Sequence, residues 1–172
     1  MAELNTVIRN RRSVRKYTEE KVSQDKVDEI IEAGLWAASG MGKQAPVILQ
    51  IDDKETRDQI AKLNAAVMGR DMDPFYGAPQ VLIVLADRSV PTYLYDGALT
   101  MGNMMLKAYD LGVSSCWIHR AKEVFNTEEG KAILARAGIE GDYEGIGNLI
   151  IGYCDGELPA ARERNQGRVY KI

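Results

Sequence analysis

Three arginines and a serine stand close together near the N-terminus, in the segment RRSVRKY at residues 11–17. Arg11, Arg12, Ser13 and Arg15 provide charged and neutral hydrogen-bond donors within a short stretch. Guanidinium groups favour phosphate and carboxylate ligands, because their planar fork can donate two parallel hydrogen bonds. The segment therefore predicts a site for a phosphate and a second acidic or acceptor group. The alternative is a basic turn exposed to water, which is common.

Two polar side chains fall at positions where a helical pattern places apolar ones. Arg11 stands seven residues after Leu4 on one stripe, and Asn64 stands four residues after Ile60 on another. An inward arginine needs a carboxylate or a phosphate, and an inward asparagine needs a donor and an acceptor side by side, as the edge of a heterocycle offers. The alternatives are a core arginine that pairs with Asp or Glu, and an asparagine satisfied by backbone.

The segment SGMGKQAP, residues 39–46, is a second candidate for ligand contact. Its glycines allow backbone N–H groups to approach a ligand closely. It is not a phosphate-binding P-loop, because Ala37 stands where the first glycine belongs and Gln44 replaces Ser or Thr. The Gly-rich dinucleotide motif is also missing, since Gly145 and Gly147 are followed by Asn, Leu and Ile.

The chain is poor in side chains that catalyse reactions by themselves. Its one histidine, His119, cannot build a His-rich metal site, and a zinc set of Cys116, His119 and Cys154 has unsuitable spacing. The nucleophile motif GxSxG is missing as well. A predicted anion site without protein-borne catalytic groups favours a bound cofactor that carries the chemistry.

Helices and strands that could position these residues alternate along the chain, which is typical of an α+β or α/β domain. Apolar periodicity and capping residues predict helices over 2–10, from Ser23 through Ala38, over 55–68, over 93–111, and from the capping pair Asn126 and Glu129 to Gly138. Strands are expected over Val47–Ile51, Val81–Ala86, Ser114–Ile118 and Asn148–Tyr153. The second strand is apolar at every position and should be central, with both faces covered.

Two segments indicate contact with something beyond the core. Residues 93–111 form a helix that is apolar nearly all round, so it should be buried in the core or against another subunit. The tail, 157–172, is polar and basic without helical periodicity. It ends on Val169, Tyr170 and Ile172, which suggests that it docks on a surface.

Composition sets the outer limits. With 172 residues, 45% of them hydrophobic, the chain is expected to form a single domain over 1–172. The net charge of −3 gives no reason to expect nucleic acid or an anionic membrane as a partner. Without a signal peptide or membrane span in the sequence, a cytoplasmic protein is expected, with Cys116 and Cys154 as reduced thiols.

Five segments, in order, resemble the FMN-dependent nitroreductase family. RRSVRKY resembles its N-terminal flavin motif, and SGMGKQAP resembles its Pro-Ser-Gly-Met-Asn loop. The central strand in 76–87, the long helix and following strand in 96–118, and the C-terminal strand with its basic tail in 150–172 complete the resemblance. Together they cover nearly the whole chain.

The resemblance implies a fold, an assembly and a set of cofactor contacts. The fold would be a central mixed, mainly antiparallel sheet flanked by helices, in an intertwined homodimer with FMN at the subunit interface. Carried over by position, the implied FMN-binding residues are Arg11, Arg12 and Ser13 at the phosphate and ribityl end, Arg15 and Asn64 at the pyrimidine edge, Ser39, Gly40 and Met41 from the other subunit, the backbone of Ile118 and His119, and Arg162 and Arg164 at the phosphate.

The implied activity is electron transfer by a ping-pong mechanism, from NAD(P)H to an electron-poor acceptor such as a nitroaromatic compound or a quinone. No catalytic residue is expected, since the chemistry takes place on the flavin. The alternative is a protein that stores or senses FMN without turnover. The chain departs from the family pattern at Ala38, Gly42 and Ala45–Pro46, and these departures put one flavin contact and the pocket shape in question.

Overall fold

The apolar run Val81–Ala86 is the centre of the molecule in the computed structural model, which describes residues 3–172. It lies within strand β2 (Gln80–Asp87), between β1 (Pro46–Ile51) and β4 (Tyr143–Gly152), while β3 (Ser114–Ile118) pairs with the outer side of β4. Every side chain from Val81 to Ala86 is fully buried, and all three strand pairs are antiparallel. The central strand and the mainly antiparallel sheet are therefore confirmed.

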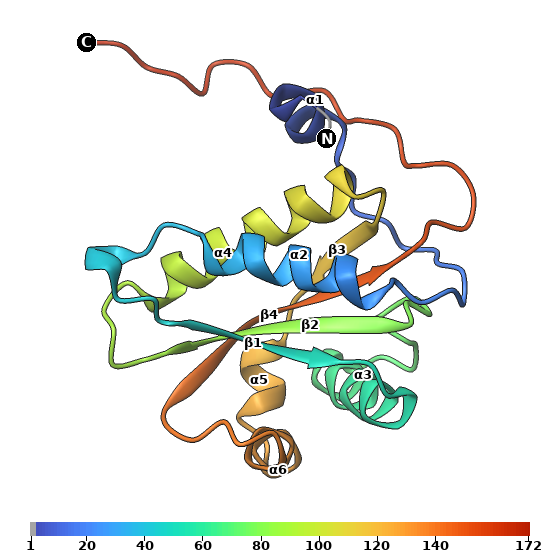
Figure 1. Ribbon diagram of the computed structural model, residues 1–172, viewed down its shortest axis with the longest axis vertical. Coiled ribbons are helices and arrows are strands. Elements are labelled where there is room, and N and C mark those ends of the chain that lie inside the picture. Colours follow the sequence, from blue (N-terminus) through green and yellow to red (C-terminus); the bar gives the residue numbers. More distant parts are fainter. Residues whose placement is uncertain (1–2) are drawn as a thin grey trace.

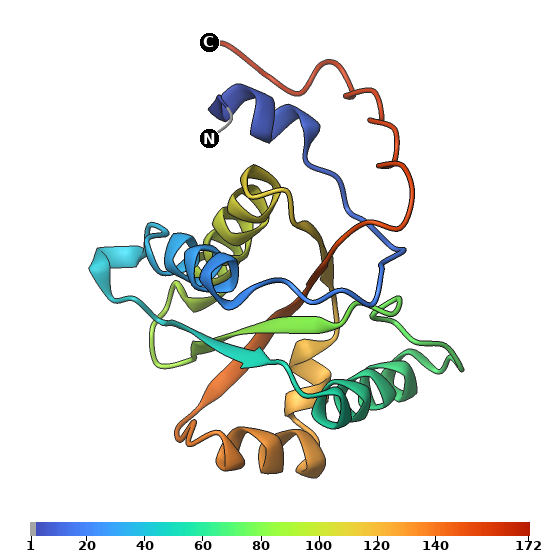
Figure 2. The same ribbon diagram turned by 45° about the vertical axis from the view of Figure 1, so that its right-hand side comes forward.

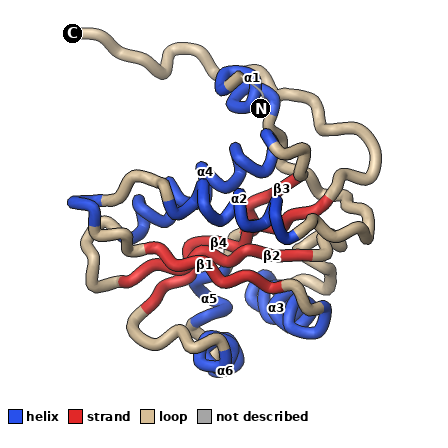
Figure 3. Tube along the Cα trace, viewed as in Figure 1, coloured by secondary structure: helices blue, strands red, loops and turns tan. Residues whose placement is uncertain are grey.

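Helices cover both faces of this sheet (Figure 1, Figure 3). On one face lie α2 (Gln24–Leu35) and α4 (Tyr93–Asp110), and on the other lie α3 (Lys54–Met68), α5 (Ala121–Phe125) and α6 (Glu128–Arg136). Alternate side chains of β2 and β4 point to opposite faces, so the core divides into two clusters, one under each helical layer. Within the described residues no helix has the length and apolar composition to cross a membrane.

The N-terminal segment adds a short parallel contact to this sheet. Ser13 pairs with Ser115 of β3 in parallel orientation, and Tyr17 pairs with Cys154 in antiparallel orientation. The preceding helix α1 (Leu4–Asn10) stands away from the sheet, with only Val7 of its residues buried (Figure 2). The expected helix over 2–10 is thus present from Leu4, while residue 2 lies outside the described residues.

Three expectations about element boundaries need correction. Helix α2 ends at Leu35 rather than at Ala38, and the Ser23 side chain forms no capping hydrogen bond. The side chain that caps α6 is Thr127, which accepts a hydrogen bond from the Gly130 N–H, and not that of Asn126. Strand β4 begins at Tyr143 rather than at 148, through glycines that hide a strand pattern. Gly145 allows a close approach, because a Cβ there would lie 2.4 Å from the Ala121 carbonyl carbon at the start of α5. Helix α5 is itself too short for its periodicity to predict it.

Helix α4 is only partly buried within one chain, and the end of the C-terminal tail is exposed. Met101 and Met104 of α4 are fully buried, but Leu94, Tyr95 and Leu99 are 47%, 73% and 50% exposed. After β4 the tail runs past α1 as an extended chain and leaves the body of the molecule (Figure 1, Figure 2). The tail's terminal apolar side chains are exposed, so they do not dock on the chain that carries them.

Candidate functional site

The arginine segment is held against β3 by its backbone. The Val14 N–H donates to the Ser115 carbonyl over 3.1 Å, and the Val14 side chain is 1% exposed. Tyr17 supports the segment through its hydroxyl, which donates to the Val14 carbonyl over 3.0 Å. A buried valine between polar neighbours thus fixes Ser13 and Arg15 at the edge of the sheet.

The guanidinium groups of Arg11 and Arg12 carry buried N–H donors that find no acceptor among residues 3–172, at Nη1 of Arg11 and Nε of Arg12. A second nitrogen of Arg12, Nη1, turns back to the carbonyls of Arg9 and Arg11, at 2.7 and 2.8 Å, at the end of α1. Buried charged donors without an acceptor are costly, whereas an anion would satisfy them. The alternative of a core Arg11 paired with a carboxylate is not seen in the described chain.

Cys116 of β3 lies close to the arginine segment. The thiol is buried and free, as expected. Burial raises its pKa, while the charges of Arg15 and Arg11 and a hydrogen bond from Ser13 act in the opposite direction. Arg11, Ser13 and Arg15 therefore lie around one point of β3, as the sequence pattern predicts.

Arg15 opens into a cavity of about 360 Å³ beside the end of β3. Its guanidinium carbon lies 6.0 Å from the centre of the Tyr76 ring, and within residues 3–172 it forms no ion pair with a carboxylate. The cavity thus has positively charged and aromatic walls. Its lining residues are Arg15, Met68, Arg70, Pro74, Tyr76, Trp117, Ile118, His119 and Arg120.

Asn64 lies behind this cavity and is fully buried. Its side-chain Nδ2 donates to the His119 carbonyl over 2.8 Å, while its Oδ1 has no partner among the described residues. The donor half of the amide is thus satisfied by backbone, and only the acceptor half is left for a ligand. The structure brings Asn64, Arg15, Ile118 and His119 into one place.

A second cavity, of about 410 Å³, lies on the other side of the same turn. It shares Trp117, His119 and Arg120 with the first and extends to Leu94 of α4. Glu144 lines it as a buried carboxylate, with Lys122 at 3.1 Å. The turn from β3 to α5 therefore stands between two cavities.

The loop at residues 39–46 does not line either of these cavities. It contains the 3-10 turn η1 (Gly40–Gly42) and docks on the start of α4, where the Gly40 N–H donates to Asp96 Oδ1 over 3.0 Å. A Cβ at Gly40 would fall 2.3 Å from Thr92 Oγ1, so this approach requires glycine. Ser39 Oγ accepts from the Gln44 N–H, and Met41 is 81% exposed. Within one chain these residues stay apart from Arg15 and His119.

The tail arginines are not buried together with the phosphate candidates. Arg162 and Arg164 are exposed on the extended segment that leaves the molecule, as Figure 1 shows for that segment. A contact from these residues to a shared ligand therefore stays a prediction.

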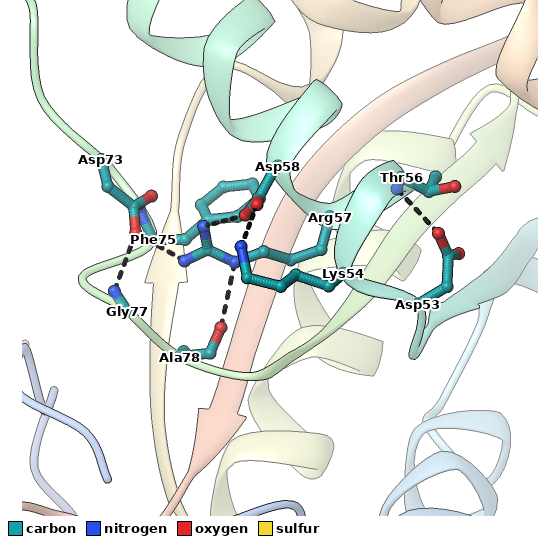
Figure 4. Close-up of polar contacts among 9 residues, drawn as sticks. All are labelled: Asp53, Lys54, Thr56, Arg57, Asp58, Asp73, Phe75, Gly77 and Ala78. Carbon is teal, nitrogen blue, oxygen red and sulfur yellow. Dashed lines mark hydrogen bonds and ion pairs between the residues drawn. The ribbon is translucent and has the colours of Figure 1, made fainter. Parts of the chain in front are cut away.

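Sequence reasoning missed the residues that hold the Tyr76 loop (Figure 4). Arg57, 7% exposed, donates to the Ala78 carbonyl at 3.0 Å and to Asp73 at 2.6 Å. Asp73 in turn accepts from the backbone N–H groups of Phe75 and Gly77. Tyr76, between those two residues, has a φ of 52°. A charged residue on the apolar side of α3 was the available signal.

Comparison with known proteins supports one family. The nitroreductase family model matches residues 8–71. The structure of a nitroreductase with bound FMN from Bacteroides fragilis superposes with a TM-score of 0.90 at 25% identity, covering 100% of both chains. Among relatives, a putative NADH dehydrogenase/NAD(P)H nitroreductase of Methanothermobacter thermautotrophicus is 25% identical over 64% of this chain and 57% of its own length. An FMN reductase [NAD(P)H] of Bacillus subtilis is 34% identical over 42% of this chain and 30% of its own.

The matched regions span little more than half of the first relative and less than a third of the second. The structural match, by contrast, extends over the full length of both chains. Taken with the family model at the arginine segment and α3, this match shows that the chain resembles the nitroreductase family.

Proposed function

We propose that the chain is an FMN-dependent oxidoreductase that acts as a homodimer and passes electrons from NAD(P)H to an electron-poor acceptor, a nitroaromatic compound or a quinone. The observation that carries the proposal is the set of buried, unpartnered guanidinium donors of Arg11 and Arg12, in the same short segment as Arg15, which lines a cavity. The chain matches an FMN-bound nitroreductase over its whole length, which makes FMN the natural occupant.

The residues present fit FMN at both of its polar ends. Arg11, Arg12 and Ser13 offer donors for the phosphate, and the unpartnered Asn64 Oδ1 offers an acceptor for the imide N–H of the pyrimidine edge. Ile118 and His119 supply backbone at the cavity wall. Ser39, Gly40 and Met41 would be contributed by the partner subunit, together with Arg162 and Arg164 at the phosphate.

Bound FMN would supply two-electron transfer, first from NAD(P)H and then to the acceptor, so that the two substrates react in turn. The chain's own contribution is position and charge. Arg15 holds a cation at the cavity without a carboxylate to neutralise it, and this cation stabilises negative charge that develops on a bound ligand. Tyr76 supplies an aromatic wall to the cavity.

The decisive experiment is anaerobic spectroscopy of the purified protein. We expect flavin absorbance, bleaching on addition of NADPH or NADH, and recovery when a nitroaromatic compound or a quinone is added. Bound flavin that neither donor bleaches would support the alternative, a protein that stores or senses FMN. A protein that cannot be loaded with FMN would overturn both.

A further inference from the structure

Asn148 is a polar residue in the middle of an apolar strand. It lies in β4 opposite Ile83 of β2 and Ile118 of β3, and its side chain is fully buried. Asparagine is disfavoured in strands, and a buried amide is costly unless its donors and acceptor are paired. An apolar β-branched residue would pack better at this position, so the buried amide indicates a role other than packing.

The Asn148 amide reaches the end of β3. Its Nδ2 lies 3.3 Å from the Ile118 carbonyl and 3.5 Å from the His119 carbonyl. The Asn64 Nδ2 donates to that same His119 carbonyl over 2.8 Å, from helix α3. Two side-chain amides from different elements thus converge on one peptide group. Both amide oxygens stay without a partner within residues 3–172, so neither residue is fully satisfied by the protein.

The peptide that they contact leads into a strained residue. Arg120 has a φ of 82°, in the left-handed region that residues other than glycine rarely adopt. Such a conformation persists only where the surrounding structure holds it. The amides of Asn64 and Asn148 act on the carbonyl immediately before this residue, and the Val124 N–H donates to the Arg120 carbonyl over 2.9 Å, so the two amides restrain the turn on its β3 side.

The direction of the peptide follows from its planarity. In a trans peptide the C=O and the following N–H point in opposite directions, so the Arg120 N–H points away from Asn64 and Asn148. No cis peptide occurs among the described residues. His119 and Arg120 both line the two cavities that flank the turn, and the Arg120 N–H has no backbone acceptor in the described chain.

We propose that Asn148, acting with Asn64, is a positioning residue that fixes the His119–Arg120 peptide and so presents the Arg120 N–H to the ring of bound FMN. The proposal rests on the proposed function, because that ring is the group the donor would serve. A hydrogen-bond donor of fixed direction interacts unequally with oxidised and reduced flavin, since their ring nitrogens differ in protonation. Differential interaction with two states shifts the equilibrium between them.

The test is an anaerobic redox titration of FMN-loaded wild type, Asn148→Val and Asn148→Ser, with thermal unfolding of each. Valine removes the amide and suits a strand, while serine keeps a small polar group. The matched control is Asn103→Leu on α4, because the Asn103 amide also donates to a backbone carbonyl, that of Ala33 over 3.0 Å. Asn103 lines neither cavity at the turn.

We expect both Asn148 variants to bind FMN, and the ratio of their affinities for reduced and oxidised flavin to change by roughly three- to tenfold, about 15–30 mV for a two-electron couple. We also expect Asn148→Val to melt no lower than wild type, since it removes a buried unpaired acceptor. The control should leave the potential unchanged. An unchanged potential in Asn148→Val, or a folded variant that no longer binds FMN, would overturn the positioning role. A wild type without reducible flavin would instead count against the proposed function.

Discussion

The charge of Arg15 is the most specific feature of the site at the scale of single residues. Oxidised flavin is neutral at the pyrimidine edge and reduced flavin is negative there, so a cation at that edge favours the reduced state. Arg15 faces the cavity with no carboxylate to neutralise it in the described structure, whereas its neighbour Lys16 pairs with Asp155 at 2.7 Å on the surface. The two adjacent cations should therefore affect FMN differently.

Arg15→Gln should lower the midpoint potential of bound FMN and slow its reduction by NAD(P)H, while FMN still binds. One charge-assisted hydrogen bond of roughly 1.5–3 kcal/mol corresponds to some tens of millivolts. The measurement is an anaerobic redox titration, with Lys16→Gln as the control that removes an exposed, paired charge. Equal potentials in Arg15→Gln and wild type would contradict the assigned role, and loss of FMN would move Arg15 to the phosphate site.

Arg11 is predicted to hold the phosphate of FMN. Arg11→Ala removes a charged donor worth roughly 1.5–3 kcal/mol, so the Kd for FMN should rise about tenfold to a hundredfold. Arg164→Ala in the tail should weaken binding in the same direction. The control is Arg9→Ala, which removes an exposed arginine two residues earlier on α1. Fluorescence titration of the apoprotein gives the Kd values, and unchanged affinity in both Arg11→Ala and Arg164→Ala would show that the anion site lies elsewhere.

Residue types revealed part of this site and concealed the rest. Arg11 and Asn64 were found because each breaks an apolar helical stripe, and the structure shows both with buried, unpartnered atoms. Asn148 breaks an apolar strand in the same way, but the expected strand began at that residue, so it passed as an end position. Tyr76 gave no signal at all, because its φ of 52° and its place at the cavity depend on contacts from α3.

At the scale of elements, α3 supports both the turn after β3 and the loop before β2. One part of it carries Asn64 and Met68 to the turn after β3 and to the cavity, and another part carries Arg57 to the loop before β2. The Arg57 guanidinium spans this loop by bonding to Asp73 and the Ala78 carbonyl, and it stacks 5.4 Å from the Phe75 ring centre (Figure 4). The helix and the loop therefore present their cavity residues as one unit.

Arg57→Ala should destabilise the protein by about 2–3 kcal/mol, because it leaves the Ala78 carbonyl and the Asp73 carboxylate without their charged donor. Lys54→Ala on the same helix removes an ion pair with Asp58 that is exposed on the lysine side, and should change stability by less than about 1 kcal/mol. Urea unfolding of both variants measures the difference. Equal stability of the two variants would contradict the role assigned to Arg57.

Elements marked by a local pattern were predicted well, and those that depend on tertiary contacts were not. The strand Ser114–Ile118 was predicted with its observed bounds, and the helices over 55–68 and 93–111 differ from α3 and α4 by one residue at an end. Helix α5 and the first half of β4 escaped prediction, since each depends on the other. Position 145 requires glycine because the backbone of α5 lies against it. This is a tertiary contact, which a local sequence pattern does not reveal.

The whole molecule presents an apolar surface that one chain does not cover. Leu94 and Leu99 on α4 are about half exposed, and Val169 and Tyr170 at the end of the tail are more than 80% exposed. Exposed apolar groups on a long helix and on an extended arm mark a surface for association. The loop at 39–46 also lines neither of the two cavities at the turn after β3 within one chain.

Assembly and cofactor binding should therefore depend on each other. Because Ser39–Met41 and Arg164 would reach FMN from the partner, a monomer would hold only part of the contacts, and FMN would in turn stabilise the dimer by linkage. Leu99→Glu places a charge in the apolar surface of α4, so we expect a monomer by light scattering with a Kd for FMN raised at least tenfold. The control is Met72→Glu, which places a charge at a 38% exposed apolar residue beside Arg57 and Ala61 of α3, and it should leave both properties unchanged. If wild type is a monomer while FMN is fully bound, or if Leu99→Glu separates the subunits without weakening FMN binding, the site is complete in one chain and the shared-site arrangement is wrong.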